Sequence, residues 1–435
     1  MRLGAGEGIK AFGPASIKVS RGRVEVFGKE LRTGDELVVH RLKSYPLVAL
    51  EDSELELRLV NSSQIMSMPS DEPYFEWRDF ASSLGSGRVN RVVVLGPIDS
   101  GKTSLSLTLL NYFTRAGASP ALIDADVGQG FLAPPSFVAL GYPIGQALGK
   151  RDFAVRCRWF VGDIKPEGRW QTITSMVTRY SELASSEGRR PLVVDTDGWV
   201  SSVDALRYKL ELILGLEANV VIVLDKSLAG QLKGLEKIGV KVVYLRSPAT
   251  RKGRDRDERR ELRSDRYREH LANAKPLKVS LDDVIFVGMP FLEGEQLAGD
   301  LLKMAGVKVL SCRRVADALY VIASGKIPGE LPREIFNEYG VREVVVVNED
   351  ELSGLYVSLV GQGRGCEALE CPAILSKIDH EGRYVIFVTP CEGLKVKVVR
   401  CSHYRLTEEF REEKLDVYRY RAGVEAIPHE RSQAA

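Results

Sequence analysis

The chain has 435 residues, of which 44% are hydrophobic and 28% are charged. This length exceeds one ordinary hydrophobic core and predicts about two to four domains. The formal net charge of +2 gives no general attraction for nucleic acid, so any such role needs a local basic patch. No uncharged apolar run reaches the roughly 18 residues of a membrane-spanning helix. The first residues lack the apolar core of a signal peptide, which predicts a cytoplasmic protein without a membrane partner.

The cysteines and histidines form no metal-binding pattern. None of the six cysteines belongs to a CxxC pair, and the five histidines are scattered, which argues against a zinc site. We expect buried free thiols, with a disulfide between Cys366 and Cys371 as the alternative.

Short strands are predicted in the first region, residues 1–78. Apolar and polar residues alternate over residues 16–31, 35–51 and 55–60, with frequent glycines between them. This pattern is typical of a small β-sandwich or barrel. The polar stretch from Asn61 to Pro73 is the predicted linker.

The second region, residues 79–278, alternates strands of Val, Ile and Leu with amphipathic helices. Strands are predicted at residues 91–95, 120–124, 191–195, 219–224 and 240–245, and helices at residues 100–116 and 202–215. Continuous apolar strands separated by helices indicate a parallel sheet with helices on both faces. Ligands of such a sheet bind beyond the carboxyl ends of its strands.

A phosphate-binding loop follows the first of these strands and opens a helix. Residues 96–103, GPIDSGKT, fit the pattern GxxxxGK[ST]. Gly96 and Gly101 permit a tight turn in which backbone N–H groups converge on phosphate oxygens. Lys102 suits the β- and γ-phosphates and the Thr103 hydroxyl suits Mg²⁺. The predicted nucleotide-binding residues are Gly96, Pro97, Ile98, Asp99, Ser100, Gly101, Lys102, Thr103 and Ser104.

The third region, residues 279–435, returns to a strand-rich pattern. Its apolar strands are predicted at residues 284–288, 318–324, 343–348, 355–361, 383–390 and 395–401. The predicted fold is therefore an α/β P-loop NTPase domain flanked by N-terminal and C-terminal β-rich domains.

Carboxylates follow the second strand of the central region. Asp124 and Asp126 are two residues apart, so on an extended segment both side chains point to the same side, toward the nucleotide. One can hold Mg²⁺ or its waters, and the other can accept a proton as a general base. The alternative is that either aspartate only caps the following turn. Gln129 lies just beyond them.

The segment DTDGW, residues 195–199, ends another buried strand. Asp195 is in the position where many P-loop NTPases place an acidic residue near Mg²⁺. The segment also fits the DxxG pattern of GTPases, but no NKxD guanine reader follows. Trp199 could stack on a nucleic-acid base, or it could be an ordinary packed aromatic residue.

Nine arginines lie between Arg246 and Arg268. The mixture with acidic residues is typical of a solvated helix with ion pairs four residues apart. Arg259 and Arg263 are also four residues apart, on one helix face that continues to Arg266. Arginines of this kind close over a transferring phosphoryl group in kinase lids, so a lid is the favoured interpretation.

Together these segments resemble the P-loop RNA 5′-hydroxyl polynucleotide kinases, a family with stand-alone archaeal enzymes and a subunit of the eukaryotic pre-mRNA cleavage machinery. The matching stretches are GPIDSGKTSL, IDADVGQG, FVGDIKPEG, DTDGWV and RRELRSDRYREHL. The resemblance implies transfer of a phosphoryl group from ATP or GTP, with Mg²⁺, to the 5′-hydroxyl end of RNA, or of DNA. It also implies RNA-processing protein partners.

The family motifs assign roles to individual residues. Lys102 stabilises the migrating phosphoryl group, while Thr103 and Asp124 serve the metal and Asp126 is the general base. The remaining implied contacts are Thr196 for the metal, Gln129 and Trp199 for nucleic acid, Arg259 and Arg263 for the lid, and Arg246 for phosphate. Extra residues between Arg246 and Arg259 leave Arg251 and Arg260 as alternative lid arginines.

Functions from other classes remain open at this point. A nucleotide-binding scaffold of an RNA-processing complex would lack the base or the lid arginines, and Asp126, Arg259 and Arg263 are all present. A P-loop NTPase without a nucleic-acid acceptor would hydrolyse nucleotide alone.

Overall fold

The computed structural model describes residues 1–85, 89–248, 255–362, 370–421 and 424–428. Over these residues the chain divides into two compact units. The first comprises Met1–Ala133, Val138–Cys157 and Lys165–Arg254, and the second comprises Pro134–Phe137, Arg158–Ile164 and Asp255–Ala435. The three-domain division at residues 78 and 278 stays a prediction.

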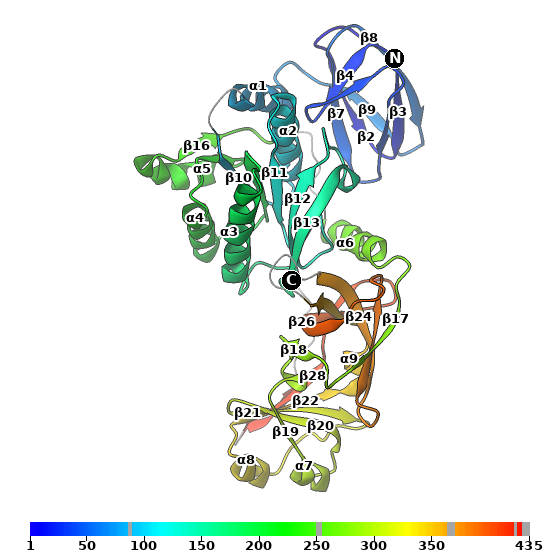
Figure 1. Cartoon of the computed structure of the whole chain (residues 1–435), viewed down its shortest axis with the longest axis vertical. Helices are drawn as coiled ribbons and strands as arrows, with labels where there is room; N and C mark the ends of the chain where they lie inside the picture. Colours follow the sequence, from blue (N-terminus) through cyan, green and yellow to red (C-terminus); the bar gives the residue numbers. More distant parts are fainter. Residues whose placement is uncertain (86–88, 249–254, 363–369, 422–423, 429–435) are drawn as a thin grey trace. The chain divides into compact units, whose positions relative to one another are not determined.

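The first unit begins with short antiparallel strands, blue in Figure 1. In β3 the residues alternate, with Ala15, Ile17 and Val19 buried and Lys18 exposed, because successive side chains of a strand point to opposite faces. The strands pair in the orders β1-β8-β3-β6 and β5-β4-β7-β2-β9. Their bounds are β1 Arg2–Leu3, β2 Gly8–Phe12, β3 Ala15–Arg21, β4 Arg23–Val26, β5 Lys29–Arg32, β6 Glu36–Val39, β7 Ser44–Ala49, β8 Ser53–Leu59 and β9 Gln64–Ser67.

The predicted linker from Asn61 to Pro73 is wrong in part, because strand β9 lies within it. This strand pairs with β2 in antiparallel register, Ile9 opposite Ser67 and Phe12 opposite Gln64. Its side chains are mostly exposed, so it lacks the apolar alternation that identifies a strand in a sequence. Helix α1, Pro73–Gly85, follows directly.

A largely parallel sheet forms the centre of the first unit (Figure 1). Its strand order is β13-β12-β11-β14-β10-β15-β16, and the run from β11 to β16 is parallel. Strand β12 departs from the predicted parallel arrangement, since it pairs antiparallel to β11. The bounds are β10 Arg91–Leu95, β11 Ala121–Ala125, β12 Phe137–Pro143, β13 Phe153–Phe160, β14 Leu192–Thr196, β15 Val220–Val223 and β16 Lys241–Tyr244.

Helices cover both faces of this sheet, as predicted. Helix α2 connects β10 to β11, and α4 connects β14 to β15. These two connections run in opposite directions across the sheet. Because crossovers between parallel strands are right-handed, connections in opposite directions lie on opposite faces. Helix α3 packs against α4. The helix bounds are α2 Lys102–Arg115, α3 Trp170–Ser186, α4 Val203–Gly215 and α5 Lys226–Leu232.

A buried carboxylate joins the N-terminal strands to the helix that follows the phosphate-binding loop. Glu25 of β4 is fully buried. It accepts hydrogen bonds from the Tyr74 hydroxyl and the Arg78 Nε atom of α1, at 3.0 and 2.8 Å. It also accepts from the Tyr112 hydroxyl and Arg115 Nη1 of α2, both at 3.0 Å. These charge-assisted bonds fix the N-terminal sheet to the P-loop helix.

The second unit is strand-rich, as predicted, and also contains short helices. Its sheets have the strand orders β17-β25-β24-β23-β26-β18, with β27 on β26, and β19-β20-β21-β22-β28-β29. The element bounds are α6 Arg256–His270, β17 Lys275–Ser280, β18 Ile285–Val287, β19 Glu295–Leu297, α7 Asp300–Met304, β20 Lys308–Val315, β21 Ala318–Ser324, α8 Arg333–Tyr339, β22 Glu343–Asn348, α9 Glu349–Leu352, β23 Leu355–Gly361, β24 Glu370–Asp379, β25 Tyr384–Thr389, β26 Val396–Leu406, β27 Glu412–Lys414, β28 Val417–Arg421 and β29 Val424–Pro428.

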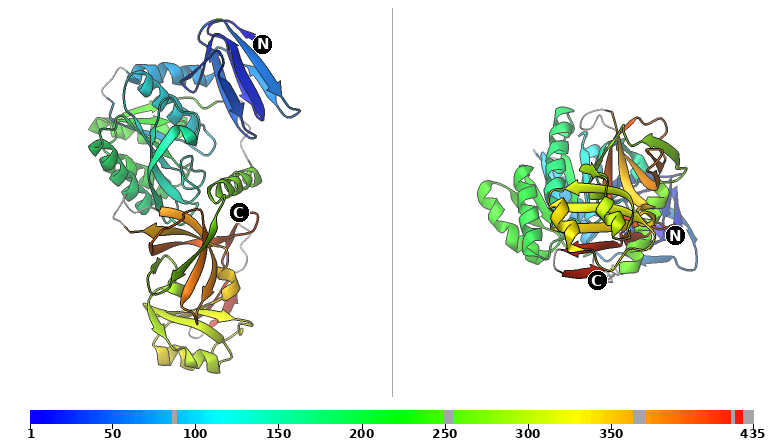
Figure 2. Two further views of the ribbon diagram at one scale, coloured as in Figure 1. Left: turned by 45° about the vertical axis from the view of Figure 1, so that its right-hand side comes forward. Right: turned by 90° about the horizontal axis from the view of Figure 1, so that it is seen from below.

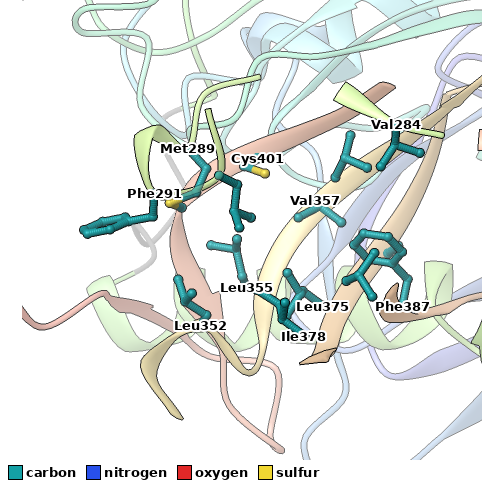
Figure 3. Close-up of a cluster of buried hydrophobic side chains, with 14 of the residues drawn as sticks. Val284, Met289, Phe291, Leu352, Leu355, Val357, Leu375, Ile378, Phe387 and Cys401 are labelled. Carbon is teal, nitrogen blue, oxygen red and sulfur yellow. The ribbon is translucent and has the colours of Figure 1, made fainter. Parts of the chain in front are cut away.

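One apolar core of the second unit lies among these strands. Figure 3 shows Val357, Leu375 and Phe387, which come from β23, β24 and β25 and are almost completely buried. Strands rich in Val, Leu and Ile form such a layer because each buried face removes apolar surface from water. The turned views in Figure 2 show these strands in yellow and orange.

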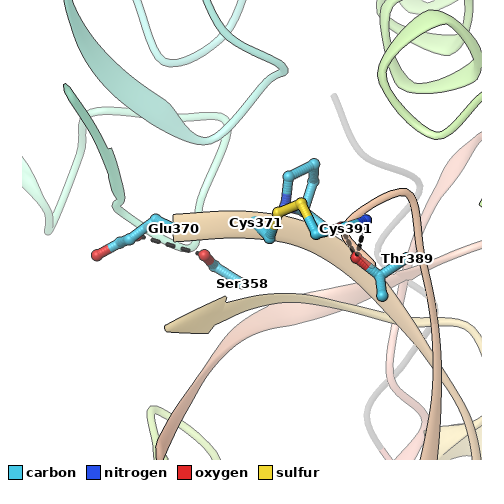
Figure 4. The surroundings of a disulfide bond; sticks show 6 residues. Ser358, Glu370, Cys371, Thr389 and Cys391 are labelled. Carbon is cyan, nitrogen blue, oxygen red and sulfur yellow. Dashed lines mark hydrogen bonds between the residues drawn. A yellow bond between two sulfur atoms is a disulfide. The ribbon is translucent and has the colours of Figure 1, made fainter. Parts of the chain in front are cut away.

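The prediction of free thiols is wrong for Cys371 and Cys391, which form a disulfide (Figure 4). Cys371 lies on β24 and Cys391 follows β25, the neighbouring antiparallel strand, so their Cα atoms are 6.4 Å apart. Twenty residues separate them in sequence, and only strand pairing brings them together. Cys312 and Cys401 are buried thiols. The alternative Cys366–Cys371 pairing is wrong, because Cys371 is bonded to Cys391; Cys366 itself lies outside the described residues.

Among the described residues, no helix is both long and apolar enough to cross a membrane.

Candidate active site

The phosphate-binding loop connects β10 to α2 at the carboxyl edge of the central sheet. Gly101 precedes the helix with φ of 100°, and Asp99 also has a positive φ of 61°. Lys102 is buried and its Nζ donates to the carbonyl oxygens of Gly96 and Pro97, at 3.0 and 2.8 Å. The ammonium group therefore lies within the loop, where the N–H groups of the helix start also favour negative charge.

Close packing behind the loop depends on glycine. A Cβ atom at Gly101 would lie 2.8 Å from the Trp77 ring of α1. A Cβ atom at Gly198, in the DTDGW segment, would lie 2.7 Å from the backbone nitrogen of Ile98. The glycine of this segment thus lets the loop after β14 touch the phosphate-binding loop directly.

Replacing Gly198 with alanine is expected to weaken nucleotide binding about 5- to 100-fold, because overpacking costs roughly 1–3 kcal/mol and here displaces the loop backbone. Titration of the nucleotide against the purified variant measures the effect. The matched control is Gly230→Ala in α5, where no atom lies within 4 Å of the added methyl group. Equal affinities for both variants would contradict the expectation.

Paired carboxylates lie beside the loop at the ends of neighbouring strands. Asp124 of β11 and Asp195 of β14 are register partners, and both are buried. Burial raises the pKa of each carboxyl group to about 7. Asp124 accepts hydrogen bonds from the backbone N–H groups of Phe131 and Leu132, which lower its pKa in part. Nearby Asp124 raises the pKa of Asp195 further.

Asp195 has the surroundings of a cation-binding group. Its Oδ1 atom is buried and makes no hydrogen bond among the described residues, while the nearby Thr103 side chain lowers the pKa of the carboxyl group. No group of three or more His, Cys, Asp and Glu residues in the described chain forms a complete metal site. The oxygen atoms of Thr103 and Asp195 are of the kind that Mg²⁺ accepts, since this ion typically binds a few protein oxygens together with substrate phosphates.

Asp126 lies just beyond the end of β11 and is partly exposed. Its Oδ1 accepts hydrogen bonds from the N–H groups of Gly128 and Gln129, at 3.0 and 2.9 Å, so it does cap the following turn. Burial raises the pKa of the Asp126 carboxyl group, and the neighbouring Lys102 lowers it. Gln129 is partly exposed on the same turn. Because the turn begins after Ala125, Asp126 is at the open edge of the sheet while Asp124 is inside it.

The Thr196 side chain, predicted to contact the metal, is fully buried. Its hydroxyl donates to the Val94 carbonyl oxygen at 2.8 Å and so ties β14 to β10. Its contact with a metal stays a prediction.

A buried ion pair joins the DTDGW loop to helix α4. Lys209 of α4 is fully buried and its Nζ lies 2.8 Å from Asp197 Oδ2. The same oxygen accepts from the Tyr208 hydroxyl at 2.9 Å, and Asp197 Oδ1 accepts from the Trp199 N–H at 2.9 Å. Burial lowers the pKa of Lys209, and the Asp197 charge opposes this effect. Asp197 thus fixes the backbone from which Trp199 projects.

Two tryptophan rings lie near the buried Tyr208. The ring centroid of Trp199 is 6.2 Å from that of Tyr208, and the centroid of Trp170 is 6.0 Å from it. Tyr208 is buried, whereas both tryptophans are partly exposed. Trp199 is therefore a packed aromatic residue that keeps some exposed surface, and its stacking on a nucleic-acid base stays a prediction.

The predicted phosphate contact Arg246 lies after β16 and is held by α1. Its Nε atom is 3.0 Å from Glu76 Oε2 in a half-exposed ion pair, and its carbonyl accepts from Trp77 Nε1 at 2.9 Å. The backbone position is fixed, while the guanidinium pairs with a carboxylate in this structure.

The predicted lid arginines lie on α6, which begins with a capping box formed by Asp255 and Glu258. Arg263 forms a two-pronged ion pair with Glu412 of β27, with Nε–Oε1 at 2.7 Å. Arg260 lies 4.0 Å from Asp257. The helix belongs to the second unit, so contact of Arg259 or Arg263 with phosphate stays a prediction. Arg251 lies outside the described residues.

Sequence reasoning missed several residues of the site. Glu76 and Trp77 lie in α1, a helix that was not predicted. The predicted linker ended at Pro73, where this helix begins. Lys209 carried a usable signal, because it occupies the buried stripe of α4 with Ala205, Tyr208, Leu212 and Ile213. A lysine in such a stripe predicts a buried carboxylate partner.

The fold and this site define a P-loop nucleotide-binding domain with β-rich flanks, as predicted. Residues 96–273 match the family model of the mRNA cleavage and polyadenylation factor CLP1 P-loop. The central region of the chain is therefore similar to the CLP1 P-loop family, and the resemblance identified from its motifs is confirmed.

Curated relatives and solved structures agree with this assignment. A polyribonucleotide 5′-hydroxyl-kinase of Pyrococcus abyssi is 28% identical over 331 residues, covering 73% of this chain and 88% of that protein. Another, of Methanocaldococcus jannaschii, is 27% identical over 321 residues, covering 71% and 84%. The solved wild-type Clp1p–Pcf11p complex matches with a TM-score of 0.65 and 16% identity over 93% of this chain and 97% of the other, which indicates a shared fold.

Proposed function

We propose that this protein is a polynucleotide 5′-hydroxyl kinase that transfers the γ-phosphate of ATP or GTP to the 5′-hydroxyl of RNA, with DNA as a second acceptor. One observation carries the proposal: a partly exposed carboxylate, Asp126, lies beside the lysine of a phosphate-binding loop. A carboxylate in this position can accept the proton of an attacking hydroxyl group, as phosphoryl transfer to an alcohol requires. The names of the similar archaeal proteins support the same activity.

In the proposed reaction, the 5′-hydroxyl oxygen attacks the γ-phosphorus in line with the leaving nucleoside diphosphate. Asp126 accepts the hydroxyl proton as the new O–P bond forms and the bond to the β-phosphate oxygen breaks. Lys102 leaves the carbonyls of Gly96 and Pro97 and offsets charge on the migrating phosphoryl group. Thr103, Asp124 and Asp195 would hold Mg²⁺, which would supply positive charge to offset the charge of the phosphates.

The acceptor strand is proposed to lie along the turn and loop beyond β11 and β14. Gln129 offers an amide to the nucleic acid and Trp199 offers a ring for one base. Arg259 and Arg263 are proposed as the lid and Arg246 as a phosphate contact, which requires the Arg246 guanidinium to leave Glu76. Binding to an RNA-processing protein is proposed as well, because a solved relative is a complex with Pcf11p. The cytoplasmic location stays a prediction.

The test is an acceptor screen with γ-labelled ATP and GTP. We expect label on 5′-hydroxyl oligoribonucleotides and none on the same strands carrying a 5′-phosphate. The matched control is Lys102→Ala, which should label neither. Nucleotide hydrolysis without labelling of any 5′-hydroxyl strand would exclude the kinase and favour an NTPase, and tight binding without turnover would favour a scaffold.

Replacing Trp199 with alanine is expected to raise the KM for a 5′-hydroxyl oligoribonucleotide about 5- to 100-fold, because stacking on a base is worth roughly 1–3 kcal/mol. The KM for ATP should not change. Steady-state kinetics with each substrate varied in turn measures the two KM values separately. Trp199→Phe keeps an aromatic face and should recover most of the loss, while a Phe variant as poor as the Ala variant would exclude stacking.

A further inference from the structure

A cavity of about 600 Å³ lies in the second unit, within the range of small-molecule sites. It is lined by residues of the segment that carries β18, by β20, and by residues between β24 and β25. All of these residues belong to the second unit, and the kinase site described above uses none of the lining residues.

Apolar side chains form one part of the cavity wall, and polar or charged residues form the rest. Val284 and Ile378 line it and also belong to the buried core, where Figure 3 shows them near Phe387. Phe286 and Leu310 add apolar surface, and Ile285 is 62% exposed. An apolar wall beside polar groups, with an opening to solvent, favours a ligand with an apolar body and a polar head.

Arg313 supplies an uncompensated positive charge. Its Nη1 donates to the Gly294 carbonyl oxygen at 3.2 Å, and its Nε atom is buried without a partner among the described residues. No described carboxylate forms an ion pair with it. The edge formed by Nε and Nη2, which binds a carboxylate or phosphate with two parallel hydrogen bonds, therefore has no protein acceptor.

The other charged groups lining the cavity, Arg383 and Glu293, form no ion pair with Arg313 among the described residues. Arg383 lines the cavity and pairs with Asp282, and it also lowers the pKa of Arg313 after the larger effect of burial. Glu293 accepts the N–H of Met289 at 2.8 Å.

His380 adds a second buried nitrogen to the cavity. Its Nε2 atom makes no hydrogen bond among the described residues and lies 3.9 Å from Glu349. A buried donor atom without an acceptor, such as Arg313 Nε, is costly, and a bound anion would supply that acceptor.

We propose that this cavity binds a small organic anion, with its carboxylate or phosphate head on Arg313 and His380 and its apolar body against Val284, Leu310 and Ile378. The proposal does not depend on the kinase activity. A carboxylate and a phosphate both accept hydrogen bonds through negatively charged oxygens, and the experiment below distinguishes the two.

The test follows the ring signals of the five histidines in the full chain by NMR, with the His380 signal assigned from its absence in His380→Asn. Octanoate, octyl phosphate, octanol and inorganic phosphate are the probes. We expect saturable shifts of the His380 signal with octanoate or octyl phosphate. Octanol should bind at least about tenfold more weakly, because a charge-assisted hydrogen bond contributes roughly 1.5–3 kcal/mol. Whichever anion binds more tightly identifies the head group.

Arg313→Met should weaken anion binding at least about tenfold for the same reason. Arg314→Met, the exposed neighbour on β20, is the matched control and should bind as the unsubstituted protein does. If Arg313→Met does not fold, Arg313→Lys keeps the charge without the planar edge and should still bind more weakly. The proposal is overturned if no anion shifts the His380 signal, if octanol binds as tightly as octanoate, or if neither Arg313 variant loses affinity relative to Arg314→Met.

Discussion

Replacing Asp126 with asparagine is expected to lower kcat for phosphoryl transfer about 10²- to 10⁴-fold, the usual contribution of a general base. Asparagine keeps an oxygen that can accept the N–H groups of Gly128 and Gln129, so the turn should persist. It cannot take the proton of the 5′-hydroxyl group. Single-turnover transfer from labelled ATP measures the rate, and the affinity for ATP should change little.

Asp225→Asn is the matched control. Asp225 also follows a strand of the same sheet, β15, and its Oδ1 caps the start of α5 by accepting the Leu228 N–H at 2.7 Å. If capping alone explained Asp126, both substitutions would have similar small effects. An Asp126→Asn variant that transfers at the unsubstituted rate would exclude this aspartate as the base.

Replacing Lys209 with methionine is expected to lower the free energy of unfolding by about 3–5 kcal/mol, because it leaves Asp197 buried without its counter-charge. Asp197 is 3% exposed and lies 2.8 Å from Lys209 Nζ. The DTDGW loop should loosen at the same time, since Asp197 also accepts the Trp199 N–H. Denaturant unfolding followed by tryptophan fluorescence measures the change.

Two comparisons separate this effect from a simple loss of packing. The double variant Lys209→Met with Asp197→Asn removes both charges and should recover most of the stability. Glu217→Gln removes the charge from a pair of similar length, Arg91–Glu217 at 3.0 Å, whose carboxylate side chain is 83% exposed. It should cost less than about 1 kcal/mol. A loss for Lys209→Met as small as that of Glu217→Gln would show that the buried pair is unimportant.

Most local elements of the first unit were predictable. Strand β10 was predicted with its observed bounds, and α2 and α4 within a few residues of theirs, because apolar period, glycine and capping residues are local signals. Strand β9 was missed since its side chains are mostly exposed. The disulfide between Cys371 and Cys391 was missed because strand pairing alone joins them.

In the candidate site, too, the local features were predictable and the long-range contacts were not. The phosphate-binding loop is a continuous segment, and its glycines, Lys102 and Thr103 were identifiable from their spacing. The carboxylates were found by motif, but their neighbours were not: the contact of Gly198 with Ile98 is a backbone approach between separate loops. The pairs of Arg246 with Glu76 and of Arg263 with Glu412 join residues more than a hundred positions apart.

The sequence by itself determined the loop, the alternation of strands and helices, and the family that the central region resembles, since each depends on residues close together in the chain. Only the tertiary structure decided that Asp124 and Asp195 lie side by side, that Glu25 joins the N-terminal sheet to α2, and that Lys209 supports Asp197. Burial and strand register set these contacts. A buried charge needs a partner, and that partner comes from a distant part of the chain that local sequence patterns do not identify.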